Sequence, residues 1–369
     1  YKDLIIHFSL NNLFQIDQDW AMLIVVVLVI PYTIYGGFRS VTYTDVIQAI
    51  IMIITLIVAP IAGLMYLADM PEGTVFAHNI SDALAKSGES YSTMTGGAVL
   101  NESSALYGTL DGIFPNSLNV IKGLGSGIII AGAFSWFFGY LGGQPQLTMR
   151  FMAIKDERNA KIARNIGVIW TIIAYTGALM VGWIGIAIFG PNGLEDQETV
   201  MPEVLTTVFH PVVSGILITG VLAAIISTAN SLLILSATEL SENVIKSGKS
   251  SIDSKKSLFQ SRLVTAILSL VALLMAYFSP SDLIYAIVGY VWAGIGSTFS
   301  IVILLTLFWK RFHGIPALLT IIVGLTFTIF WIVSGFDEII TSRLLTFVVA
   351  GLTAIVSTYL IKKREHSES

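Results

Sequence analysis

The sequence predicts an all-α, polytopic membrane protein. Of its 369 residues, 54% are hydrophobic and only 12% are charged, whereas soluble domains carry about 25% charged residues. The mean hydropathy is +0.79. The apolar runs are continuous and do not alternate with polar residues, which favours membrane helices over the strands of a barrel.

Runs of about 18 or more mostly apolar residues predict nine transmembrane helices. They cover about 19–36, 43–67, 124–151, 165–189, 211–236, 262–279, 283–308, 315–334 and 343–361. The connections between them are short apart from residues 68–123, which we expect to form an external loop. Between the first two helices, Gly36 and Gly37 are expected to form a tight turn.

The placement of basic residues predicts the orientation of these helices. With nine alternating spans, 16 of the 20 Lys and Arg residues fall on one side, and the opposite side has acidic loops. Since cytoplasmic loops carry the excess of Lys and Arg, the basic side is predicted to be cytoplasmic. The protein is therefore expected in the plasma membrane, with residue 1 outside and the C-terminus inside.

Several classes of function are disfavoured by the residues themselves. The chain has no cysteine, and its five histidines are widely separated, so no metalloenzyme motif is present. The predicted spans hold almost no paired ionisable groups, which argues against an intramembrane enzyme. No cofactor and no nucleic-acid partner are expected. Because the chain begins with Tyr1 rather than methionine, we expect it to be a fragment.

The stretch from Gly132 to Arg150, GAFSWFFGYLGGQPQLTMR, has the pattern of a broken membrane helix. Glycine and proline in its middle free backbone groups from the helical ladder, and at membrane depth these need protein or a water-filled cavity to satisfy them. Trp136 and Tyr140 share one helix face before the break. The pattern fits both a ligand site and a proline kink packed against neighbouring helices.

A second polar cluster lies in the middle of the span at 211–236. Ser227, Thr228, Asn230 and Ser231 place four polar side chains within five residues. Their oxygens, with the Ala224 carbonyl one turn earlier, are the ligands that a hard cation such as sodium prefers. Small polar residues also hold helices together or bond back to the preceding turn, and the pattern leaves both interpretations open.

Asp45 and Gln48 form a third polar feature, three residues apart on one face near the inner end of the next helix. Asp45 fits either a helix N-terminal charge or a group that attracts a cation leaving a cavity.

Together these segments resemble the sodium:solute symporter family, and most closely its sodium/proline symporters. The resemblance covers the chain from about Ile30 onward. It rests on GGFRSVTYTDVIQ at 36–48, GYLGGQPQLTMRFMA at 139–153, LAAIISTANSLL at 222–233 with ATELSENVIK at 237–246, and YVWAGIGSTF at 290–299 with Trp309, Lys310 and Arg311.

The resemblance implies a leucine-transporter-type fold of two inverted five-helix repeats that works by alternating access. Residues 1–18 would be an external segment, and residues 19–308 would hold the last two helices of the first repeat and all five of the second. Residues 309–369 would add two accessory helices and a cytoplasmic tail. The chain would act as a monomer in the lipid bilayer.

The resemblance also assigns residues to sites. Ala224, Ser227 and Thr228 match the family's sodium ligands, Ser231 with Asn230 falls where some members place a second sodium, and Asp45 matches the acidic residue of the sodium release path. For the solute, Trp136, Tyr140 and Pro145, with Gln144 beside them, resemble the proline-pocket residues. This chain departs from the family pattern by having both Gly142 and Gly143 before Gln144.

The implied function is sodium-driven import of a small carboxylate-bearing solute, with proline first. The alternatives are pantothenate or another amino or organic acid as solute, and a transporter-like membrane sensor.

Overall fold

The computed structural model describes residues 18–87, 138–139, 143–241, 254–277, 284–336 and 342–361. This part of the chain consists of helices and connecting turns and contains no strand. Seven of its helices are long and apolar enough to cross a membrane. The predicted all-α membrane class is therefore confirmed for the described residues.

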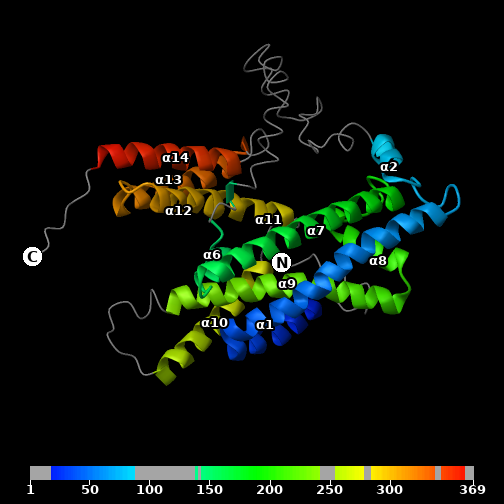
Figure 1. The fold of residues 1–369 in the computed structure, drawn as a ribbon, viewed down its shortest axis with the longest axis horizontal. Coiled ribbons are helices and arrows are strands. Elements are labelled where there is room, and N and C mark those ends of the chain that lie inside the picture. The colour runs from blue at the N-terminus through cyan, green and yellow to red at the C-terminus, as the bar shows by residue number, and fades with distance from the viewer. Residues whose placement is uncertain are drawn as a thin grey trace, which may run out of the picture. The chain divides into compact units, whose positions relative to one another are not determined.

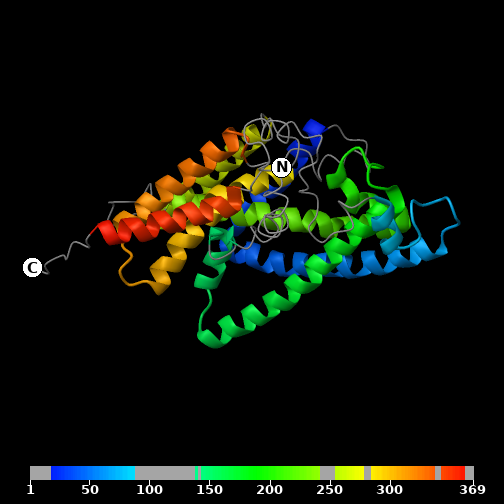
Figure 2. The ribbon, with the colours of Figure 1, turned by 90° about the horizontal axis from the view of Figure 1, so that it is seen from above.

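The chain divides into two compact units. The described helices of unit 1 are α1 (Gln18–Asp69), α2 (Ile80–Ser87), α7 (Glu157–Phe189), η2 (Gln197–Thr199), α8 (Val200–Val208), α9 (Pro211–Thr238) and α10 (Ser254–Tyr277). Those of unit 2 are α6 (Pro145–Met152), α11 (Ile284–Val291), the π-helix η4 (Trp292–Ser297), α12 (Thr298–Phe308), α13 (Gly314–Val333) and α14 (Ser342–Leu360). Figures 1 and 2 show the course of these helices within each unit.

In unit 1, α1 packs against both α7 and α9. A Cβ atom added to Gly177 of α7 would meet Leu56, and one added to Gly63 of α1 would meet Ile184. The paired residue numbers rise together along both helices, so α1 and α7 run parallel. Glycine at these contacts lets the two backbones approach closely, as is usual between membrane helices.

The neighbouring helix α9 runs in the opposite direction along α1. The hydroxyl of Thr55 donates to the carbonyl of Leu217 at 3.2 Å, and a Cβ on Gly220 would meet Thr55 and the carbonyl oxygen of Ile51. These directions agree with the alternating spans predicted from the basic residues, in which the helices at 43–67 and 165–189 run one way and the helix at 211–236 runs back.

The core of unit 1 lies at the end of α1 near Asp69. Its fully buried side chains include Leu67, Ile184, Val204, Leu205 and Ile218. The segment after α1 folds back over this core, because the amides of residues 76 and 77 donate to the carbonyls of residues 188 and 187 at 3.3 and 2.9 Å. The last turn of α7 and the segment 70–79 are thus held together through backbone hydrogen bonds.

Unit 2 is packed through small and hydroxyl-bearing residues. The hydroxyls of Thr328 in α13 and Thr346 in α14 lie 2.7 Å apart, and a Cβ on Gly324 would meet Thr298. Ala350 and Ala354 of α14 are fully buried beside α12. Small residues and interhelical hydroxyl bonds are the usual means of packing between membrane helices.

Of the nine predicted spans, seven coincide with span-length helices of the structure. The predicted span at 124–151 lies largely outside the described residues. The last part of this span is described and forms α6. The predicted span at 19–36 is helical, but it is not a separate element, because α1 continues without interruption from Gln18 to Asp69. The count of nine is therefore not confirmed.

The tight turn predicted at Gly36 and Gly37 is wrong for this structure, since both residues lie inside α1. Glycine lowers helix propensity by about 1 kcal/mol relative to alanine, which weakens a helix without ending it. No proline follows within the next residues to stop the helix.

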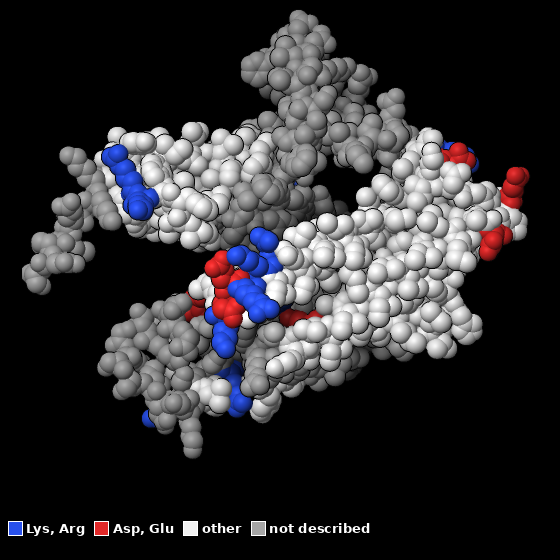
Figure 3. Space-filling model, in the orientation of Figure 1, with Lys and Arg blue, Asp and Glu red and all other residues white. Residues whose placement is uncertain are grey.

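Charged residues gather at the ends of the unit 1 helices. Figure 3 shows Lys and Arg together with acidic side chains around the start of α7, and an uncharged surface along its length. Large apolar side chains along α1 and α7 are exposed, among them Ile61, Met65, Ile169, Ile172 and Tyr175. An uncharged, apolar band between charged ends is what a bilayer requires of a spanning helix.

Candidate functional site

The hydroxyl cluster of α9 lies in a regular stretch of helix. Thr228 Oγ1 donates to the Ala224 carbonyl at 3.0 Å, and Ser231 Oγ donates to the Ser227 carbonyl at 2.8 Å. These are the back-bonds to the preceding turn that hydroxyl residues make in helices. They also bring the oxygens of Ala224 and Thr228 together on one side of α9, where both could contact one cation.

Burial differs between the members of this cluster. Thr228 is exposed and Ser227 is partly exposed, whereas Asn230 and Ser231 are buried at 0% and 6% exposure. A cation could therefore reach Ala224, Ser227 and Thr228 from the surface of unit 1, and Ser231 lies deeper, toward the neighbouring helices.

Asp45 lies on α1 in the same unit and is 9% exposed. The antiparallel register pairs Ile51 with Gly220, so moving six residues along each helix places Asp45 at about the depth of residue 226, which directly precedes the hydroxyl cluster in α9. One turn further along α1, the Oε1 atom of Gln48 is buried and has no hydrogen-bond partner among the described residues. The structure thus brings the predicted acidic residue and the predicted sodium ligands to one level of unit 1.

The predicted solute residues belong to unit 2. Trp136 and Tyr140 lie outside the described residues, and the structure describes Gln144 and Pro145. Pro145 is exposed and is the first residue of α6, where its missing amide hydrogen costs no hydrogen bond. Gln144 is 4% exposed, and its backbone carbonyl accepts from the amides of Leu147 and Thr148. A helix therefore begins directly after Gln144, as expected for the second half of the predicted broken helix, and most of the first half lies outside the described residues.

A π-helix contributes a neighbour of this break that the sequence analysis did not assign. Gly143 donates its amide to Ser300 Oγ at 3.2 Å, and a Cβ added to Gly143 would lie 1.9 Å from the carbonyl oxygen of Gly296 in η4. π-Helices are rare and often mark functional sites. The signal available in the sequence was the pair Gly294 and Gly296 in an otherwise apolar span.

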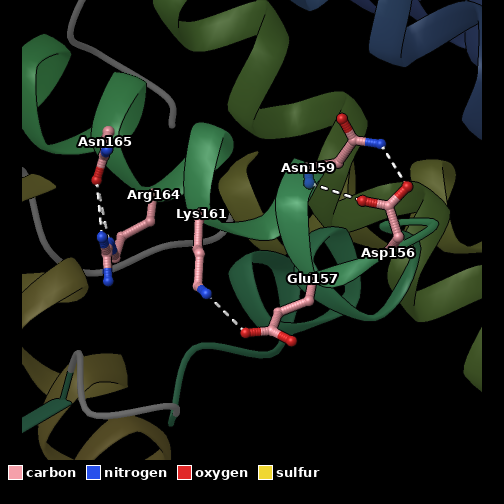
Figure 4. Close-up of polar contacts among 6 residues, drawn as sticks. All are labelled: Asp156, Glu157, Asn159, Lys161, Arg164 and Asn165. Atoms are coloured by element: carbon pink, nitrogen blue, oxygen red, sulfur yellow. Dashed lines mark hydrogen bonds and ion pairs between the residues drawn. The ribbon is translucent and has the colours of Figure 1, made fainter.

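The charged residues at the start of α7 form a helix cap. The Asp156 carboxylate accepts from the backbone amide and the side-chain amide of Asn159 at 2.8 and 2.9 Å (Figure 4). Glu157 and Lys161 form an exposed ion pair at 2.7 Å, and Arg164 donates to Asn165. These contacts are local to the first turns of α7.

Among the groups outside the spanning helices, burial raises the pKa of Glu203 in α8 above its usual value. Glu203 lies in the short segment between α7 and α9, away from the hydroxyl cluster along the chain. Among the described residues, no group of three His, Asp or Glu side chains could hold a metal ion.

Comparison with known proteins places this geometry in context. The sequence model of the sodium:solute symporter family matches residues 8–324. The chain is 34% identical over 353 residues to the high-affinity proline transporter PutP of Bacillus subtilis, covering 95% of this chain and 67% of that protein. It is 32% identical over 381 residues to a sodium/proline symporter of Staphylococcus aureus, with coverage of 96% and 67%.

A third relative is sodium/proline symporter 2 of Staphylococcus saprophyticus, 31% identical over 364 residues, of which the chain covers 64%. The chain thus spans about two thirds of the length of these relatives. Among solved structures, the substrate-bound outward-open state of a Na+-coupled sialic acid symporter matches with a TM-score of 0.70 at 15% identity. That match covers 96% of this chain and 70% of the other, and it shows likeness of fold.

Proposed function

We propose, from the premise that the chain belongs to the sodium:solute symporter family, that its protein imports L-proline together with sodium. The observation that carries this proposal is the pairing of the hydroxyl cluster with Asp45 in one unit, in a chain whose relatives at 31–34% identity are proline transporters. Sodium needs oxygen ligands at membrane depth, and α9 supplies them. The sequence of α9 contains no Lys or Arg that would repel the ion.

In this proposal Ala224, Ser227 and Thr228 hold the coupling sodium. Two of their oxygens already lie 3.0 Å apart, which supports a shared ligand. Asp45, buried at the same level, would attract sodium on its way to the cytoplasm, and Ser231 would serve a second sodium. The full coordination shell would include groups from outside this chain's described residues.

The solute would be held at the break of the predicted broken helix 132–150, next to Gln144. Trp136 and Tyr140 would form the apolar wall around the pyrrolidine ring, and Pro145 and Gln144 would lie at the start of α6, where the helix dipole favours a carboxylate. The fold likeness to a Na+-coupled symporter supports the alternating-access mechanism with two inverted repeats. Residues 19–308 would belong to the transporting core, and residues 309–369 to accessory helices that end in the cytoplasm.

The experiment is uptake of labelled L-proline by the full-length protein in proteoliposomes. An inward sodium gradient should drive accumulation, and replacing sodium with potassium should abolish it. Unlabelled proline should compete, whereas pantothenate and sialic acid should not. Uptake that persists without sodium, or that pantothenate blocks as well as proline does, would contradict the proposal.

A further inference from the structure

The broken helix of unit 2 is in backbone contact with the π-helix η4. A Cβ added to Gly296 would lie 2.8 Å from Gln144 Nε2 and 3.1 Å from the Cα atom of Gly139. On the other side, Gly143 meets the Gly296 carbonyl and bonds to Ser300, which is fully buried. The absence of side chains at Gly143 and Gly296 is therefore a requirement for the present position of Gln144.

The side-chain amide of Gln144 is held at one end and unpartnered at the other. Its Oε1 atom accepts from Gln146 Nε2 at 3.1 Å, whereas its buried Nε2 atom has no hydrogen-bond partner within the described part of the chain. Burying an amide without an acceptor costs about 1–3 kcal/mol. Such a group in a folded protein calls for an explanation, and a ligand that supplies the acceptor is one.

The chemistry around this amide favours an anionic acceptor. The Gly143 amide is already bonded to Ser300, and Pro145 has no amide hydrogen. The residues on either side of Gln144 thus offer no free backbone donor, and the side-chain amide is the donor at this position. It also lies directly before the first residue of α6, at the positive end of that helix.

We propose that Gln144 Nε2 donates a hydrogen bond to the carboxylate of the transported solute, and that Gly296 and Ser300 are positioning residues that hold Gln144 in place. This inference rests on the proposed function and names the group of the solute that is recognised. Gln146 fixes the orientation of the Gln144 amide, so that its NH2 group faces away from the bond they share.

The decisive variant is Gln144→Glu, which keeps the acceptor for Gln146 but replaces the donor with a like charge. In proteoliposomes with a sodium gradient, the KM for L-proline should rise by about tenfold or more, because a charge-assisted hydrogen bond is lost and repulsion is added. The sodium concentration for half-maximal uptake should change by less than about twofold, since the proposed sodium ligands belong to α9. L-Prolinamide, which lacks the carboxylate, should inhibit the wild type weakly and the variant about as well as L-proline does.

Two glycine variants test the positioning role with a matched control. Gly296→Ala places a Cβ against Gln144 and should raise the KM for proline and reduce the preference for proline over prolinamide, with little change in maximal rate. Gly294→Ala lies in the same π-helix, but its Cβ would only reach ordinary contact with Thr328 at 3.4 Å. It should behave as the wild type.

The outcomes separate the two proposals. A wild-type protein without sodium-dependent proline uptake overturns both. If the wild type transports but Gln144→Glu keeps the wild-type KM and the preference for proline over prolinamide, only this inference fails. If Gln144→Glu does not reach the membrane, Gln144→Asn is the substitute variant. Its shorter side chain moves the amide donor away from the solute, so it should also lose the preference for proline over prolinamide.

Discussion

Thr55 Oγ1 donates to the carbonyl of Leu217, which joins α1 to α9 in the middle of unit 1. A Cβ on Gly220, one turn along α9, would lie 2.4 Å from the same hydroxyl. This contact sets the register of the two helices and, through it, the level of Asp45 along the helix axis relative to the hydroxyl cluster. Disturbing it should therefore affect both the stability of the protein and its sodium dependence.

Gly220→Ala is expected to destabilise unit 1, because the added methyl group has no room beside Thr55. Overpacking of this kind typically costs about 1–3 kcal/mol. Thermal unfolding of the detergent-solubilised protein would show a lower midpoint. Gly215→Ala in the same helix, where a Cβ meets nothing within 4 Å, is the control and should not lower the midpoint, because alanine favours the helix over glycine.

Thr228→Ala should weaken sodium activation without unfolding the protein, since Thr228 is exposed in α9. Loss of one oxygen ligand should raise the sodium concentration for half-maximal proline uptake by about tenfold, equivalent to about 1.4 kcal/mol. The matched control is Thr219→Ala, because Thr219 is also exposed in α9 and also bonds back to a carbonyl, that of Ile216. Equal effects of the two substitutions would argue against a sodium ligand at residue 228.

Asp156→Ala should loosen the first turn of α7, because the carboxylate satisfies the amide of Asn159. Loss of a helix N-cap costs about 1 kcal/mol. Hydrogen exchange of the amides at residues 157–160 would report the change as faster exchange. Glu157→Ala removes only the exposed pair with Lys161 and should alter stability by less than about 0.5 kcal/mol.

Glu203→Gln should stabilise the protein at neutral pH, because burial raises the pKa of this carboxyl in the folded state. The folded protein then favours the neutral form, so the stabilising contribution of the protonated group is complete below the unfolded pKa and disappears as pH rises through the folded pKa. The difference in melting temperature between variant and wild type should be positive at pH 7 and vanish in acid, where both are neutral.

The sequence predicted the helices well because their signal is simple. A run of about 20 apolar residues has few alternatives in a bilayer, and the parallel and antiparallel directions of α1, α7 and α9 follow the distribution of Lys and Arg. The turn at Gly36 and Gly37 was predicted wrongly, because a glycine pair permits a turn but does not require one. Seven of the nine predicted spans have a counterpart of span length.

The site could be predicted only in part, for a different reason. The hydroxyl cluster at Ser227 and Thr228 is local in sequence, so composition revealed it. The contact of Gly143 with Gly296 joins residues 153 positions apart, and no periodicity within either segment encodes it. The π-helix was likewise hidden, because it differs from an α-helix by its hydrogen bonds and not by its composition. The assignments of sodium and solute residues remain predictions.

The backbone bonds of residues 76 and 77 to the last turn of α7 have a mechanical consequence. Together with the parallel packing of α1 and α7, they close a loop of contacts that joins the two helices at one end. Bending or tilting of either helix at that end would have to carry the other with it. Gly73 has open space for a side chain, although its backbone has a φ of 86°. A spectroscopic label at this residue would therefore report the joint displacement of the ends of α1 and α7.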